Sequence, residues 1–136
     1  MTQYAKLLTR SEEELMELFW NRSEPLTSVE ILNIDVNRSW NDSYIHIMLR
    51  SLLKKGTIKV CGTVQYGTQY ARQFIPIMTK EEYTAKIIIS KGLEKKSIAK
   101  VTLAMVKETS GKGEIDVIKQ LEEIIDELKE NKTKEK

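Results

Sequence analysis

The sequence has few of the residues that build disulfides, metal centres and membrane spans. It holds one cysteine, Cys61, and one histidine, His46, among 136 residues. A single cysteine excludes an internal disulfide, and two candidate ligands fall short of the four N or S ligands of a structural zinc site. The longest apolar cluster is the three isoleucines at 87–89, far short of the roughly 20 residues of a membrane-spanning helix. We therefore expect no metal, no cofactor and no membrane segment.

Signals for secretion and for catalysis are equally sparse. The first ten residues lack a basic start followed by a long apolar run, so we expect no signal peptide and a cytoplasmic protein. No nucleophile–base pair and no phosphate-cradling glycine loop is recognisable, which argues against an enzyme. Hydrophobic residues make up 40% and charged residues 31%, a composition typical of folded soluble proteins.

The net charge of +2 conceals a segregation along the chain. Residues 1–35 carry three bases and seven acids, residues 36–79 carry six bases and one acid, and residues 80–136 carry thirteen bases and twelve acids. The middle segment alone therefore has a charge of +5. Such a segment indicates a nucleic-acid contact surface, and a solvated, lysine-rich surface is the alternative.

Hydrophobic spacing and capping signals predict three helices in the first part of the chain. A Thr-x-x-Glu capping box opens a helix at 10–22, and a second such box opens a short helix beginning near Val29. A third helix, 42–55, is expected to be capped by Asn41 or Asp42 and to stop at Gly56. Its predicted inward face is Ile45, Met48, Leu49 and Leu52.

Two strand-like runs, 57–61 and 69–75, follow the third helix. The segment between them, 62–68, has glycine at both ends, which predicts a β-hairpin over 57–76 with a flexible tip. Cys61 ends the first run, and we expect it to be buried or half-buried in the strand.

Three helices followed by a hairpin is the order of a winged helix-turn-helix, in which the third helix enters the major groove and the hairpin is the wing. The expected fold is mainly α with a small β-hairpin. We expect a DNA-binding domain at 1–79 and a helical dimerisation domain at 80–136. The residues predicted to contact DNA are Ser43, Tyr44, His46, Ile47, Arg50, Ser51, Lys54 and Lys55 on the helix, and Gln65, Tyr66, Gln69 and Arg72 on the hairpin.

The rest of the chain predicts helices at 80–91, 97–107 and 114–130, with a frayed basic tail at 131–136. The wide apolar faces of these helices must be buried against another surface. A second copy of the chain is the economical partner, and folding back on the first domain is the alternative. The residues predicted at the dimer interface are Tyr83, Ile87, Ile88, Leu93, Ile98, Val101, Met105, Ile115, Ile118, Leu121, Ile125 and Leu128.

Several segments together resemble the penicillinase repressor family, which also holds the methicillin-resistance repressor and copper-transport repressors. The matching segments are Leu8-Thr9-x-x-Glu12-x-x-Leu15-Met16-x-x-Phe19-Trp20 for the first helix and Thr27-x-x-Glu30-Ile31-Leu32 for the second. The recognition helix and its stop match at Trp40, Ile45, Met48-Leu49, Leu52 and Lys55-Gly56, and the exit from the wing matches at Phe74-x-Pro76-Ile77-x-x-x-Glu81-Glu82-Tyr83. The resemblance implies a homodimeric repressor that binds double-stranded DNA at a palindromic operator.

The sequence departs from the family pattern in the recognition helix. Where the family usually has Thr-Val-x-Thr, this chain has Tyr44-Ile45-His46-Ile47, and Ser51 replaces an arginine. The predicted hairpin tip is also several residues longer than usual. These departures favour a different operator or, as the alternative function, a winged-helix protein-interaction module with weakened or lost DNA binding.

The family's known switches have no counterpart here. The place of the cleavable Asn-Phe pair reads Leu103-Ala104-Met105-Val106, so the resemblance does not extend to control by a sensor protease. Copper-responsive members carry paired cysteines near the C-terminus, and this chain has no cysteine after Cys61.

Overall fold

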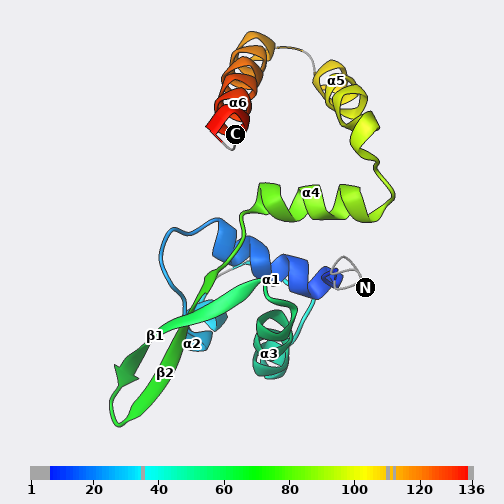
Figure 1. The fold of residues 1–136 in the computed structure, drawn as a ribbon. Coiled ribbons are helices and arrows are strands. Elements are labelled where there is room, and N and C mark those ends of the chain that lie inside the picture. Colours follow the sequence, from blue (N-terminus) through cyan, green and yellow to red (C-terminus); the bar gives the residue numbers. More distant parts are fainter. Residues whose placement is uncertain (1–6, 35, 110, 112, 135–136) are drawn as a thin grey trace. The chain divides into compact units, whose positions relative to one another are not determined.

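The computed structural model describes residues 7–34, 36–109, 111 and 113–134. The described chain forms six α-helices, one two-stranded sheet and two short 3-10 turns (Figure 1). It divides into two compact units between Gly92 and Leu93. The elements are α1 (Arg10–Trp20), α2 (Ser28–Leu32), η2 (Asp42–Tyr44), α3 (Ile45–Lys55), β1 (Ile58–Tyr66), β2 (Gln69–Pro76), α4 (Lys80–Ser90), η3 (Lys95–Ser97), α5 (Ile98–Glu108) and α6 (Glu114–Lys134).

Three helices begin at reciprocal capping boxes. At Thr9, Thr27 and Thr79 the hydroxyl accepts the amide of the glutamate three residues later, and that carboxylate accepts the threonine amide. Each box satisfies two backbone donors that the helix itself cannot pair. These local interactions confirm the predicted starts of α1 and α2.

The start of α3 differs from the prediction. Asn41 makes no side-chain cap bond, and the Asp42 carboxylate pairs with Arg38 instead. The chain enters α3 through the 3-10 turn η2. The predicted stop is confirmed, because Gly56 adopts φ of 77°, a left-handed conformation that glycine accepts without a Cβ clash.

The hairpin spans the predicted residues, but its first strand is longer and its turn is tighter than predicted. Only Gly67 and Thr68 connect β1 to β2, so most of the predicted tip, 62–66, belongs to β1. Gly67 has φ of 62° and Thr68 does not have a positive φ, which is the pattern of a type II′ turn. This turn matches the twist of the flanking strands, so the hairpin extends as a regular antiparallel ladder.

A β-bulge interrupts the ladder at Cys61. The pairing shifts between Val60 and Gly62, so Cys61 has no residue opposite it in the ladder, and its thiol donates to the Gln73 carbonyl oxygen at 3.6 Å. Cys61 is exposed, so the expectation of a buried or half-buried side chain was wrong. The extra residue in the bulge carries the thiol away from the core.

The core of the first unit lies where the helices meet the hairpin. Phe19, Ile45 and Phe74 illustrate it, at 1%, 1% and 3% exposure. Leu26 forms an isolated antiparallel bridge with Phe74, which ties the α1–α2 connection to β2. Pairing and packing together fix α2 and α3 beside the hairpin (Figure 1).

Helix α4 belongs to the first unit, whereas the sequence placed a domain boundary before it at residues 79 and 80. Tyr83 is 6% exposed, its ring lies 5.8 Å from that of Trp20, and its hydroxyl donates to Glu13 Oε2 at 3.0 Å. The same hydroxyl accepts the Leu8 amide at 3.1 Å. These contacts attach α4 to α1, and Gly92 follows the helix with φ of 98°.

The second unit consists of η3, α5 and α6. None of the described residues of α5 or α6 is buried. Helix α6 continues to Lys134, so residues 131–134 are helical where a frayed tail was predicted, and residues 135–136 lie outside the described part. No helix in the described ranges is both long and apolar enough to cross a membrane.

Candidate nucleic-acid interface

The outward side of η2 and α3 presents most of the predicted contact residues to solvent. The four apolar residues at 45, 48, 49 and 52 are all buried, so the opposite side of the helix must face outward. The exposed residues on that side are Ser43, Tyr44, His46, Ile47, Arg50 and Lys54.

Two predicted contact residues point into the protein instead. The Lys55 ammonium lies 2.5 Å from Glu12 Oε1 and 3.2 Å from the Leu7 carbonyl oxygen. The Ser51 hydroxyl donates to Glu12 Oε2. The structure therefore does not bring Ser51 and Lys55 to the exposed row of α3, and instead uses them to join α3 to α1.

Glu12 is the centre of this junction, and sequence reasoning missed its second role. Its side chain is only 5% exposed. Burial pushes the pKa of Glu12 upward, but hydrogen bonds from Lys55, Ser51 and the Thr9 amide outweigh burial and hold the pKa below its ordinary value. The capping-box pattern signalled the bond to Thr9 alone, because Lys55 lies 43 residues away along the chain.

The predicted contact residues on the hairpin differ in their exposure and in their internal contacts. Gln69 and Arg72 are exposed, and the Arg72 guanidinium lies over the Phe74 ring at 5.5 Å. Tyr66 is 38% exposed, and its hydroxyl lies 3.1 Å from the Thr27 hydroxyl at the start of α2. Gln65 donates to the Gly67 carbonyl oxygen at 2.9 Å. Tyr66 and Gln65 therefore brace the wing, and Tyr66 remains partly accessible.

A groove of about 480 Å³ lies between the hairpin and α3. His46 contributes to its wall from α3, and Tyr70 and Arg72 contribute from β2. Tyr70 is 69% exposed and was not among the predicted contacts, although it lies two residues before Arg72 and so on the same face of the strand. The groove separates the exposed row of α3 from the hairpin.

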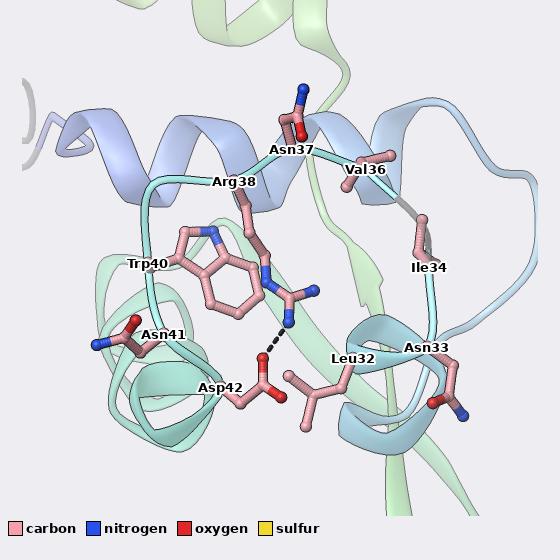
Figure 2. Close-up of a pocket in the computed structure, with 9 residues that line it drawn as sticks. All are labelled: Leu32, Asn33, Ile34, Val36, Asn37, Arg38, Trp40, Asn41 and Asp42. Carbon is pink, nitrogen blue, oxygen red and sulfur yellow. Dashed lines mark hydrogen bonds and ion pairs between the residues drawn. The ribbon is translucent and has the colours of Figure 1, made fainter.

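The connection between α2 and α3 wraps around Arg38 (Figure 2). Its guanidinium pairs with the Asp42 carboxylate and lies 4.6 Å from the centre of the Trp40 ring. Figure 2 shows this guanidinium inside the ring of loop residues. Arg38 therefore supports the entry to α3, and its charge is already paired.

The internal pairing of Arg38 and Lys55 reduces the free charge of the basic segment. The cations of that segment with no ion pair in the described structure are Arg50, Lys54, Lys59 and Arg72. No acidic residue occurs anywhere from residue 43 to residue 79. The segment that forms α3 and the hairpin is consequently cationic and carries no acidic residue of its own. Lys59 is exposed and was also missing from the predicted contacts.

Comparison with known proteins places this arrangement in a family. The model of the penicillinase repressor family matches residues 8–127, which include both the winged-helix elements and most of α6. The chain belongs to the penicillinase repressor family. That family consists of DNA-binding transcriptional repressors, which are regulatory proteins and not enzymes.

Comparisons with curated proteins and solved structures give less than the family model does. No curated protein matches the chain. Among solved structures, the crystal structure of Mycobacterium tuberculosis Rv0081 is 17% identical with a TM-score of 0.42, and the match covers 76% of this chain and 89% of that one.

The residues predicted to join two copies of this penicillinase repressor family member fall into three groups. Tyr83 is buried and Ile87 packs against the core of the first unit, so both serve α4's attachment and are not free for a partner. Ile88, Leu93, Val101 and Leu121 are half-buried. The exposed members are Ile98, Met105, Ile115, Ile118, Ile125 and Leu128, at 49%, 48%, 81%, 47%, 50% and 62%.

Proposed function

We propose that the protein is a homodimeric, sequence-specific repressor that reads a palindromic operator. In this proposal α3 enters the major groove and the β1–β2 hairpin contacts the backbone as the wing. The observation that carries it is the exposed row on η2 and α3, which contains Arg50 and Lys54 and no acid, together with Lys59 and Arg72 on the hairpin. Family membership supports the same assignment.

The dimer is supported by the uncovered apolar residues of the second unit. A 21-residue α6 with Ile115 at 81% exposure and Leu128 at 62% exposure leaves a hydrophobic stripe in water. Helices draw most of their stability from packing an apolar face, and exposed apolar patches mark interaction surfaces. Burying this stripe against a second copy gives a two-fold assembly, which explains why we expect a two-fold operator.

A dimer also compensates for the small number of free cations on each subunit. Four free cations give weak non-specific attachment. When both recognition helices occupy half-sites of one DNA molecule, the second contact becomes intramolecular, and the overall affinity rises. Operator binding requires access to DNA, so the proposal places the protein in the cytoplasm.

A gel shift with DNA from upstream of the protein's own gene tests the proposal. We expect a shift at low salt, with one protein dimer per operator, and loss of the shift as salt rises. Light scattering coupled to size exclusion measures the dimer independently of DNA. A stable dimer that binds no DNA, neither the upstream region nor a random pool, would overturn the repressor assignment.

That outcome would favour the second candidate, a winged-helix protein-interaction module. The observation in its favour is that Tyr44 is 50% exposed and Ile47 is 57% exposed, since exposed apolar side chains are typical of protein–protein interfaces. The cations around them favour DNA.

A further inference from the structure

Two large apolar side chains stand on the outward side of the recognition helix. Tyr44 is 50% exposed and Ile47 is 57% exposed. They are three residues apart, a spacing that brings side chains together on one helical surface. Ile47 also falls between Ser43 and Arg50 along the exposed row, so it occupies the middle of the proposed contact surface.

The chemistry of isoleucine restricts what Ile47 can recognise. Its side chain has no hydrogen-bond donor or acceptor, so it cannot distinguish bases by hydrogen bonding. In the major groove thymine alone carries an apolar group, the C5 methyl. The surrounding charge selects DNA over an apolar protein surface, because Arg50 and Lys54 lie one and two turns further along the same side and no acid accompanies them.

We propose that Ile47 reads a thymine through its C5 methyl group, and that each operator half-site therefore holds a required thymine opposite the middle of α3. This inference rests on the proposed DNA binding by α3 and names the base that the site selects. Tyr44 contributes apolar surface beside Ile47. Arg50 supplies the hydrogen-bonded contact on the next turn.

The expected effect is small and measurable. Removing one buried methyl group weakens binding about fourfold, using the free energy of burying one methylene-sized group. When the thymines of both half-sites are changed, binding is expected to weaken about fifteenfold. Deoxyuridine differs from thymidine only by the absence of this methyl, so it removes the contact and keeps base pairing.

The experiment selects the operator from a random DNA pool with the wild-type full-length protein. Each thymidine of the selected site is then replaced by deoxyuridine, symmetrically in both half-sites, and affinity is measured by fluorescence anisotropy. We expect one symmetric pair to lower the affinity of the wild type about fifteenfold. Ile47→Ala should bind the thymidine operator more weakly and should no longer distinguish thymidine from deoxyuridine at that pair.

Ile77→Ala is the matched control. Ile77 is 54% exposed and lies after β2, outside the proposed contact surface, so this variant should keep the full discrimination. Enrichment of a sequence with no deoxyuridine-sensitive position would overturn the inference and leave the repressor assignment intact. If Ile47→Ala still distinguished thymidine from deoxyuridine at that pair, the inference would also be overturned while the repressor assignment remained. Failure to enrich any sequence would overturn both.

Discussion

Lys54 and Lys55 are adjacent in the sequence, and the structure gives them opposite functions. Lys54 is exposed on the outward side of α3, and Lys55 is paired with the buried Glu12 carboxylate. Lys54→Met and Lys55→Met each remove one positive charge and keep an unbranched apolar stem. We expect Lys55→Met to destabilise the first unit and Lys54→Met to weaken DNA binding without changing stability.

The magnitude for Lys55→Met follows from the carboxylate it leaves behind. Removing one partner of a fully buried ion pair costs about 3–5 kcal/mol. Lys55 is 21% exposed, and Glu12 keeps its bonds from Ser51 and the Thr9 amide, so we expect about 2 kcal/mol, near the lower end for breaking a charged hydrogen bond. In a unit of this size that lowers the melting temperature by about 10 °C.

The expected effect of Lys54→Met lies in the salt dependence of binding. A surface substitution changes stability by no more than about 0.5 kcal/mol. Losing one phosphate contact per subunit makes the slope of log binding constant against log salt shallower by about 1.8 for a dimer.

Both variants are measured by tryptophan fluorescence melting and by anisotropy across a salt series. Trp20 and Trp40, the two tryptophans of the chain, both lie in the first unit, so fluorescence reports the unit that holds Lys55. Equal melting temperatures for the two variants, or an unchanged salt slope for Lys54→Met, would refute the reasoning.

Three further predictions follow from single groups. The pKa of Glu12 is lower in the folded protein than the ordinary value of 4.5. Its contribution to stability is therefore present above that value and is lost as pH falls through the folded pKa. Acid melting curves of Glu12→Gln should consequently depend less on pH than those of the wild type. Burial raises the pKa of Tyr83 to about 12, and Glu13 adds to the shift. The protonated Tyr83 hydroxyl therefore stabilises the fold below its ordinary pKa of 10.0, and this contribution is lost as pH rises through about 12. Absorbance titration should show a late tyrosine transition that is absent in Tyr83→Phe. That variant should lose about 1–2 kcal/mol of stability, because the Leu8 amide loses its acceptor. Gly56→Ala should cost about 1 kcal/mol in chemical denaturation, since no atom within 4 Å obstructs the new methyl and only the backbone conformation is strained; unchanged stability would contradict the left-handed stop of α3.

Local signals predicted the helices well because the interactions involved are local. The capping boxes at Thr9, Thr27 and Thr79 each join residues three apart, and the spacing of buried residues in α3 follows one helical period. The stop at Gly56 likewise depends on one residue. The order of these elements was enough to predict a mainly α fold with a β-hairpin.

Contacts between distant residues were not predictable in the same way. Helical spacing places Lys55, unlike Lys54, beside the inward face of its helix. Its ion pair was not predictable, because that depends on where Glu12 lies in space. Gly62 suggested the start of a turn, whereas the structure uses it beside the bulge at Cys61. Tyr83 has the same apolar spacing as a dimer residue, and only tertiary packing shows that α1 already covers it.

The salt dependence of operator binding by the wild-type protein tests the central claim most directly. Four free cations per subunit and eight per dimer give a limiting slope of about −7 for log binding constant against log salt. A measured slope near this value agrees with the account. A slope near −11, the limit for all six bases of the segment in both subunits, would contradict the internal roles of Arg38 and Lys55. A slope near zero would contradict the DNA interface itself.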